Sequence, residues 1–323
     1  MICLCCGKPI DESATPEEKK TRWHHRCVKR FFISESFPSI PLDNDALKQV
    51  AEQSVEQGFT VTGVQKKLSL HLSRKKSDKN RLTLIGHPAG YILKPQSPDY
   101  EYLPEAEDLA MRLAECVGIK TVPFGLVRVG DGDGFAYITR RIDRTPGGEK
   151  IAMEDFCQLD LRLTADKYKG SYERCGKIVS RYSSQPMFDI TELFLRIVCS
   201  FVIGNSDMHL KNFSLIETSA GSGEYRLSEA YDMLPVNIII PEDEDEMALT
   251  LNGKNRHLRR SDFLALADSY RIESKVAERL IGHVASKKEQ FLKIIKSSFY
   301  HEEGKKALCA LIEERILRIA GNS

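Results

Sequence analysis

The spacing of apolar residues along the chain changes near residue 150. Between Phe59 and Arg141, short runs alternate apolar with polar residues, and Leu68, Leu70 and Leu72 fall on one face of such a run. After residue 150, apolar residues recur every three or four positions in long segments such as 190–205. Alternation buries one face of a strand, whereas the longer period buries one face of a helix. We therefore expect an α+β fold with a strand-rich lobe, a helical lobe and a cleft where they meet.

The same pattern divides the chain into four parts. These are a small module over 1–33, a linker with a short helix over 34–57, an N-lobe over 58–150, and an all-helical C-lobe over 151–323. The linker is rich in Ser and Pro, and its helix is predicted over 45–57. In the N-lobe we predict strands over 64–73, 81–86 and 90–95, a helix over 105–117, and a hairpin that turns at Gly130–Gly134.

Cysteine and histidine are concentrated at the start of the chain. Four of the nine cysteines fall in the first 27 residues, where Cys3-x-x-Cys6 precedes the segment WHHRC at 23–27. A CxxC turn and a His-x-x-Cys pair at a helix start provide three sulfurs and one nitrogen, which suits tetrahedral Zn²⁺. We expect the ligands to be Cys3, Cys6, His24 and Cys27, with Cys5 and His25 as competing neighbours. A metal would stabilise a segment too short to bury its own core. The alternative is a disordered tail that carries cysteines.

Charge and hydropathy exclude two classes of protein. The 47 Lys and Arg residues balance 46 Asp and Glu residues, which argues against a bulk polyelectrolyte role on nucleic acid or membrane. The longest apolar stretch, Val236 to Pro241, is too short to span a bilayer. The first residues, MICLCCGKPI, lack the pattern of a signal peptide. We therefore expect a cytoplasmic protein without a membrane partner.

The strongest local signal for chemistry is GNSDMHLKNFSL at 204–215. Asp207 and Asn212 have the D-x-x-x-x-N spacing of a kinase catalytic loop, in which the Asp accepts a hydroxyl proton and the Asn binds magnesium. Alone, this spacing also fits an ordinary polar turn after a helix. Two further features strengthen the kinase interpretation because they follow the kinase order along the chain. Lys94 ends an apolar strand, and Asp232 follows Asn212 as a second metal ligand. Glu105 and Glu107 open the next helix, and either is a candidate ion-pair partner of Lys94, although acidic residues are common in a first helical turn.

Each of these features has a simpler alternative. Lys94 would be a surface lysine, Asp232 a helix cap, and the glutamates ordinary acidic residues of a first helical turn. The glycine-rich phosphate loop of kinases is absent, and the nearest substitute is the stretch Thr60 to Lys67, which contains Gly63. The occurrence of a lysine, an aspartate, an asparagine and a second aspartate in this order, at 94, 207, 212 and 232, favours phosphoryl transfer.

These residues resemble the HipA family of bacterial serine/threonine kinases, the toxins of HipBA-type systems. The matching segments, from about residue 58 to 270, are VTGVQKKLSL, YILKP, RRIDR, KYKGSYERCGKI, GNSDMHLKNFSL and AYDML. The resemblance implies a bilobal protein-kinase-like fold that uses ATP and Mg²⁺. It implies Asp207 as proton acceptor, Asn212 and Asp232 as magnesium ligands, and Lys94 as a phosphate ligand. The other nucleotide-binding residues that it implies are Thr62, Gly63, Val64, Gln65, Lys66, Lys67, Arg140, Arg141, Ile142, Asp143, His209, Lys211 and Tyr231.

The N-terminus departs from the longer HipA pattern and is more similar to short HipT-like forms. Partners implied by the resemblance are a protein substrate, such as an aminoacyl-tRNA synthetase, and a HipB-like or HipS-like antitoxin, with DNA contacted only through the antitoxin. The family's autophosphorylated loop corresponds here to Thr60 and Thr62. A rival hypothesis is a non-catalytic nucleotide-binding regulator that docks on DNA or a partner through the module over 1–33, interpreted as zinc-ribbon-like.

Overall fold

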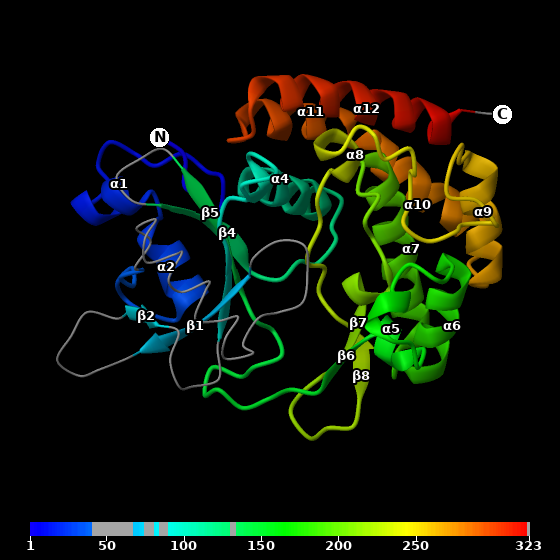
Figure 1. Ribbon diagram of the computed structural model, residues 1–323, viewed down its shortest axis with the longest axis horizontal. Helices are drawn as coiled ribbons and strands as arrows, with labels where there is room; N and C mark the ends of the chain where they lie inside the picture. The colour runs from blue at the N-terminus through cyan, green and yellow to red at the C-terminus, as the bar shows by residue number, and fades with distance from the viewer. Residues whose placement is uncertain (41–66, 74–80, 84–89, 130–133, 322–323) are drawn as a thin grey trace. The chain divides into compact units, whose positions relative to one another are not determined.

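The computed structural model describes residues 1–40, 67–73, 81–83, 90–129 and 134–321 (Figure 1). The chain forms two compact units. The first comprises Met1–Asp108 and Val122–Lys150, and the second comprises Leu109–Thr121 and Ile151–Ser323. The predicted helix over 45–57, the turn at 130–133 and the predicted site residues Thr60 and Thr62 to Lys66 lie outside the described residues.

An antiparallel sheet organises the first unit. Its strands are β1 (Leu68–Ser73), β2 (Arg81–Thr83), β3 (Tyr91–Lys94), β4 (Phe124–Arg128) and β5 (Phe135–Arg140), in the order β2-β1-β3-β5-β4. The predicted alternation is confirmed, because Leu68, Leu70 and Leu72 of β1 are all buried. The predicted hairpin is also confirmed, since β4 and β5 pair from Phe124 opposite Thr139 to Arg128 opposite Phe135. The predicted helix over 105–117 is α4 (Leu103–Cys116).

The N-terminal segment packs on the β4 edge of this sheet. It contains two short helices, α1 (Pro16–Thr21) and α2 (His25–Phe32). Trp23, between them, is fully buried and packs against the rings of Phe31 and Phe32. Its indole Nε1 donates a hydrogen bond of 2.9 Å to the carbonyl of Leu126 on β4. Residues 1–33 therefore belong to the first unit and share its core.

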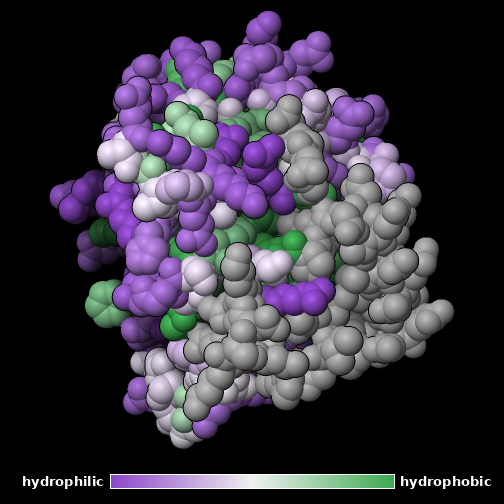
Figure 2. Space-filling model, turned by 90° about the vertical axis from the view of Figure 1, so that its left-hand side faces the viewer, coloured by the Kyte–Doolittle hydropathy of each residue, from purple (hydrophilic) through white to green (hydrophobic). Residues whose placement is uncertain are grey.

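The outer face of this region is polar. Figure 2 shows the side of the molecule that lies at the left in Figure 1, and hydrophilic residues cover most of its described surface. Apolar residues appear there only in small patches. This agrees with the burial of Trp23, Phe31 and Phe32, whose rings turn inward against the sheet.

Helices make up most of the second unit. They are α5 (Phe156–Leu159), α6 (Tyr172–Tyr182), α7 (Pro186–Val202), α8 (Val236–Ile239), α9 (Arg260–Ser269), α10 (Ser274–Ser286), α11 (Lys288–Ser297) and α12 (Glu302–Ala320), with 3-10 turns at Thr164–Asp166 and Leu210–Asn212. Helix α7 is buried on most of its surface and packs against α6, α10 and α12. Arg196, fully buried on α7, donates to the Ser228 carbonyl at 2.9 Å. This bond ties the central helix to the chain just before Asp232.

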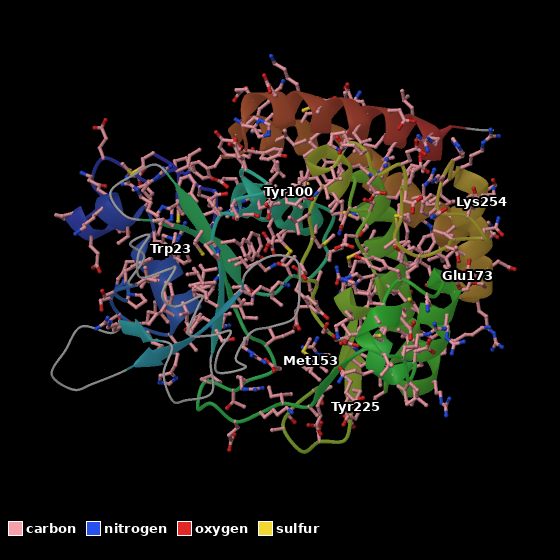
Figure 3. All side chains as sticks on the ribbon, viewed as in Figure 1. Trp23, Tyr100, Met153, Glu173, Tyr225 and Lys254 are labelled. Carbon is pink, nitrogen blue, oxygen red and sulfur yellow. The ribbon has the colours of Figure 1, made fainter. Side chains whose placement is uncertain are left out.

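The prediction of an all-helical C-lobe is wrong in one respect. Three short strands, β6 (Met153–Asp155), β7 (Ser214–Glu217) and β8 (Tyr225–Leu227), form a small antiparallel sheet in the order β6-β7-β8. Figure 3 labels Met153 and Tyr225 on its two outer strands. Strands of three or four residues are too short to display an alternating pattern, which is why residues 153–155 were predicted to be helical.

None of the described helices has the length and apolar character needed to cross a membrane.

Candidate functional sites

The predicted catalytic loop connects α7 to the small sheet. Helix α7 ends at Val202, Gly204 turns the chain with a positive φ of 76°, and β7 begins at Ser214. A left-handed turn of this kind suits glycine, which lacks a Cβ. Asp207 is half-buried on the loop, and Asn212 is buried at its end. The hydrogen-bonded ends of α7 and β7 thus set the spacing between the two side chains.

Asn212 brings the three predicted catalytic and magnesium-binding residues together. Its Nδ2 donates to the backbone carbonyl of Asp207 at 3.1 Å and to that of Asp232 at 3.5 Å. Asp232 itself has a positive φ of 59°, an uncommon backbone conformation for a residue with a side chain. Because the amide nitrogen is used in these bonds, the amide oxygen is the atom through which Asn212 would bind a cation. Amide and carboxylate oxygens are the hard ligands that Mg²⁺ prefers.

Tyr168 contacts the predicted proton acceptor directly. Its hydroxyl donates a hydrogen bond of 2.7 Å to Asp207 Oδ1, and its ring meets the ring of His209 edge-on at 5.1 Å. Burial and this hydrogen bond to Asp207 raise the pKa of the Tyr168 phenol above its ordinary value. The motif analysis did not identify Tyr168 as a site residue. The signal available was its position within KYKGSYERCGKI, one of the segments that carry the family resemblance.

The other predicted residues of this loop have defined partners. Burial lowers the pKa of His209, so the ring is neutral at pH 7, and its Nδ1 has no partner among the described residues. Lys211 Nζ forms an ion pair of 2.6 Å with Asp155 Oδ2. The hydroxyl of Tyr231 lies 2.6 Å from Ser214 Oγ and donates to the Lys211 carbonyl at 3.0 Å. Asp155, at the end of β6, is therefore a further residue that sequence reasoning missed.

In the first unit, Lys94 forms a buried ion pair. Its Nζ lies 2.5 Å from Glu107 Oε1, and Lys94 and Glu107 are 4% and 0% exposed. Glu105 instead accepts hydrogen bonds of 2.8 and 3.0 Å from the Gln96 amide. Between the two predicted partners of Lys94, the structure therefore selects Glu107. A lysine on a strand paired with a glutamate on the following helix matches the arrangement used in protein kinases.

The predicted nucleotide-binding residues at 140–143 form salt bridges and backbone contacts. Arg140 Nη1 donates to the Arg30 carbonyl at 3.0 Å, toward the end of α2. Arg141 and Arg144 both bind Asp143, at 2.6 and 2.7 Å. Although burial acts to raise it, the bonds from Arg141 hold the pKa of Asp143 below its usual value. Ile142, which follows Arg141 in the sequence, is half-buried. Lys67, another predicted nucleotide-binding residue, immediately precedes β1.

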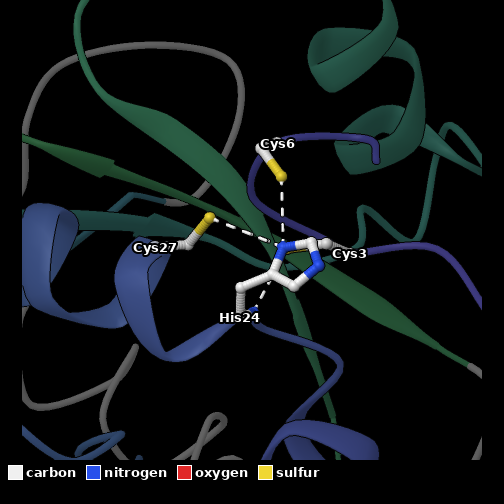
Figure 4. A group of neighbouring side chains, drawn as sticks. All are labelled: Cys3, Cys6, His24 and Cys27. Carbon is white, nitrogen blue, oxygen red and sulfur yellow. Dashed lines mark hydrogen bonds between the residues drawn. The ribbon is translucent and has the colours of Figure 1, made fainter. Parts of the chain in front are cut away.

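The four predicted zinc ligands come together near the N-terminus (Figure 4). The Sγ atoms of Cys3, Cys6 and Cys27 and a ring nitrogen of His24 all lie within 4.8 Å of one another. The two competing neighbours are not part of this cluster, and the His25 ring lies 3.0 Å from the Glu35 carbonyl oxygen. The hydrogen bond with Cys27, followed by burial, raises the pKa of the Cys3 thiol to about 12.

Comparisons with known proteins agree on one family. Residues 59–291 match the model of the HipA-like C-terminal domain. The curated protein "Putative kinase Y4dM" of Sinorhizobium fredii is 32% identical over 256 residues, which cover 75% of this chain and 61% of that protein. A "Putative kinase" of Haemophilus influenzae is 25% identical over 291 residues, which cover 81% of this chain and 82% of that protein. This chain thus spans about three fifths of the length of the Sinorhizobium relative.

Two solved structures share the fold. The Shewanella oneidensis HipA, solved in complex with HipB and its operator DNA, superposes with a TM-score of 0.63 at 18% identity, covering 83% of this chain and 69% of that chain. The Helicobacter pylori proinflammatory kinase CtkA gives a TM-score of 0.52 at 14% identity, covering 74% and 90%. These likenesses confirm a HipA-like, kinase-like fold. With the domain match over most of its length, the chain belongs to the HipA-like family of kinases.

Proposed function

We propose that the protein is an ATP- and Mg²⁺-dependent serine/threonine kinase of HipA type. The observation that carries the proposal is the placement of Asn212, whose amide joins the backbones of Asp207 and Asp232 through two hydrogen bonds. The buried pair of Lys94 and Glu107 supports it independently, because this pair is a second part of the kinase arrangement.

In the proposed reaction, Asp207 accepts the proton of the attacking hydroxyl as that oxygen bonds to the γ-phosphorus of ATP and ADP leaves. The amide oxygen of Asn212 and the carboxylate of Asp232 would hold Mg²⁺, and Lys94 would contact the nucleotide phosphates. Bound Mg²⁺ supplies charge neutralisation for the phosphate oxygens. Protein groups add little covalent chemistry to phosphoryl transfer, so the rate depends mainly on how well the reacting groups are positioned. The hydrogen bonds of Asn212 would raise the rate by holding Asp207 and Asp232 in position.

The remaining nucleotide contacts are assigned by their place in the family segments. Residues Thr62 to Lys67 would line the phosphates, Arg140 to Ile142 would meet adenine through their backbone, and Asp143 would approach the ribose. His209, Lys211 and Tyr231 would complete the site. The neutral state of His209 and the ion pair of Lys211 with Asp155 suggest that these two shape the loop and add little charge to it.

The proposal extends to regulation and partners. We infer a toxin of a toxin–antitoxin system that acts in the cytoplasm on a protein substrate, such as an aminoacyl-tRNA synthetase, and autophosphorylates at Thr60 or Thr62. A HipB-like or HipS-like antitoxin would be its partner, as the Shewanella HipA was solved with HipB and operator DNA. Contact with DNA would then be indirect, through the antitoxin.

The decisive test compares the full-length protein with Asp207→Asn in Mg²⁺ and γ-labelled ATP, followed by phosphoamino-acid analysis and mass spectrometry. We expect phosphoserine or phosphothreonine in the wild type, and a rate lower by about 10²- to 10⁴-fold in the variant. Asp268→Asn, an exposed position on α9, is the matched control and should retain the wild-type rate. Nucleotide binding without phosphoryl transfer in the wild type would instead support a non-catalytic regulator. Unmodified Thr60 and Thr62 in an active preparation would refute the autophosphorylation sites.

A further inference from the structure

Three of the six separations within the N-terminal cluster are close to those of a tetrahedral metal site. With bonds of about 2.3 Å to sulfur and 2.0 Å to nitrogen, Zn²⁺ holds two sulfurs about 3.8 Å apart and a sulfur and a nitrogen about 3.5 Å apart. Here the Sγ atoms of Cys3 and Cys27 are 3.9 Å apart. Nδ1 of His24 lies 3.4 Å from Cys6 Sγ and 3.9 Å from Cys27 Sγ. All three separations lie close to the edges of a coordination tetrahedron.

His24 is also oriented as metal-binding histidines are. Its Nε2 lies 2.9 Å from the carbonyl oxygen of Pro9, an acceptor that requires the proton to sit on Nε2. The lone pair is then on Nδ1, the nitrogen that faces the sulfurs of Cys6 and Cys27 in Figure 4. A carbonyl that fixes the tautomer of a ligand histidine is the usual outer-shell arrangement at zinc sites. The backbone N–H of His24 adds a contact of 3.5 Å to Cys3 Sγ.

A tight turn positions the backbone of Cys3 and Cys6, and the start of helix α2 positions that of His24 and Cys27. Gly7, with φ at 67°, turns the chain directly after Cys6, and its N–H donates to the Cys3 carbonyl at 2.9 Å. His24 is the N-cap of α2, which places Cys27 in the first turn of that helix. The four ligands thus come from one tight turn and one helix start, both of which form through local hydrogen bonds.

The cluster is adjacent to the contacts that hold the segment on the sheet. Leu4 lies between Cys3 and Cys5, and its carbonyl accepts a hydrogen bond of 3.0 Å from the N–H of Leu126 on β4. Trp23 precedes His24, and its indole donates to the carbonyl of the same Leu126. The N–H and the carbonyl of Leu126 are therefore both hydrogen-bonded to residues that adjoin the cluster, Leu4 and Trp23.

We propose that Cys3, Cys6, His24 and Cys27 bind one structural Zn²⁺, and that this ion fastens residues 1–33 to strand β4. The closed set of four protein ligands excludes a catalytic role, since a catalytic zinc keeps a position open for water or substrate. The ion holds Leu4 and Trp23 in place against Leu126. Since β4 pairs with β5, and β5 with the β3 strand that carries Lys94, metal loss loosens the edge of the sheet that supports the proposed phosphate-binding lysine.

Metal binding is tested on the full-length, untagged protein purified without chelator or added metal. Elemental analysis should find one zinc per chain in the wild type, and a loss of that zinc in Cys6→Ser and in Cys27→Ser. Cys5→Ser, one residue from a ligand and outside the cluster, is the matched control and should keep its zinc. If the serine variants do not fold, Co²⁺ exchange into the wild type replaces them, with the expected absorption of tetrahedral, thiolate-bound Co²⁺. Wild-type protein with no zinc and no such spectrum would overturn the site.

The fastening role has a separate readout in hydrogen exchange. Removal of zinc with a chelator should speed amide exchange at residues 124–128, because the bonds to Leu126 are lost, and leave α9 and α12 unchanged. Re-addition of Zn²⁺ should restore protection of β4. Unchanged exchange at β4 after verified zinc loss would refute the fastening role while leaving the metal site intact. Neither measurement depends on kinase activity, so failure of the proposed function would not affect the result.

Discussion

The hydroxyl of Tyr168 donates a hydrogen bond of 2.7 Å to Oδ1 of Asp207. The carboxylate proposed to accept the substrate's proton is therefore engaged by a side chain of the same unit. Tyr168 is 49% exposed and lies between the short helices α5 and α6. A substrate hydroxyl that approaches this oxygen has to share it with the phenol or displace it.

We expect Tyr168→Phe to raise kcat/KM for phosphoryl transfer. The variant removes the hydroxyl and keeps the ring that packs on His209, so the gain reflects release of one hydrogen bond to a charged acceptor, worth about 1.5 kcal/mol or roughly tenfold. Steady-state kinetics with a hydroxyl substrate measure this effect. Tyr182→Phe, an exposed tyrosine at the end of α6, is the control. A fall of similar size in Tyr168→Phe would show that the phenol orients Asp207 and that the contact assists the reaction.

The buried ion pair of Lys94 and Glu107 should contribute to the stability of the protein. Glu107→Gln removes one carboxylate from a buried ammonium and should destabilise the protein by about 3–5 kcal/mol in denaturant unfolding. Glu105→Gln is the matched control two residues away. Burial raises the pKa of Glu105 despite its bonds from Gln96, and a neutral amide can keep one of these two bonds through its oxygen. Its effect on unfolding should be small.

A double replacement separates the two roles of this pair. Lys94→Leu combined with Glu107→Leu removes both charges, so most of the stability should return, because apolar residues commonly replace a buried ion pair without loss. Phosphoryl transfer should nevertheless be lost, because the leucine at 94 cannot bind phosphate. Recovery of activity in the double variant would contradict the role proposed for Lys94.

Elements with a regular apolar pattern were predicted well from the sequence. The leucines of β1 bury one face, and α4 and α7 carry long amphipathic or apolar patterns, so burial alone dictates their type. The order of Lys94, Asp207, Asn212 and Asp232 led to the predicted catalytic loop, in which the structure joins Asp207, Asn212 and Asp232 by hydrogen bonds. The small sheet was missed because β6 and β8 have three residues each, and their stability comes from pairing with β7, which no local pattern reveals.

The features of the site and the fold that the sequence could not predict are contacts between residues far apart in the chain. Tyr168 precedes Asp207 by 39 positions and Trp23 precedes Leu126 by 103, and neither pair belongs to a common local motif. Glu105 and Glu107 were equivalent candidates for Lys94 on sequence grounds. Their separation by two positions turns them to different sides of α4, so only the three-dimensional register of β3 against that helix decides between them.

Gly125 provides a test of how closely the N-terminal segment packs on β4. A Cβ at this position would lie 2.9 Å from Cζ2 of Trp23 and 3.1 Å from the Leu4 carbonyl oxygen. Gly125→Ala should therefore destabilise the protein by about 1–3 kcal/mol, as overpacking of a rigid aromatic and a backbone atom does. Gly134→Ala, next to β5, meets nothing within 4 Å and is the control. Equal unfolding midpoints for the two variants would mean that the segment does not hold this position against β4.

The amide of Asn212 allows a discriminating replacement, because aspartate has the same shape and is a stronger magnesium ligand. In Asn212→Asp, an anionic oxygen takes the place of the Nδ2 that donates to the carbonyls of Asp207 and Asp232. Two attractive contacts become repulsive, so the positions of both acidic residues should be lost. We expect phosphoryl transfer to fall by at least about 100-fold, the effect of roughly 3 kcal/mol, and excess Mg²⁺ not to restore it. Kinetics over a range of Mg²⁺ concentrations measure this, and full activity at high Mg²⁺ would show instead that Asn212 acts only through its oxygen.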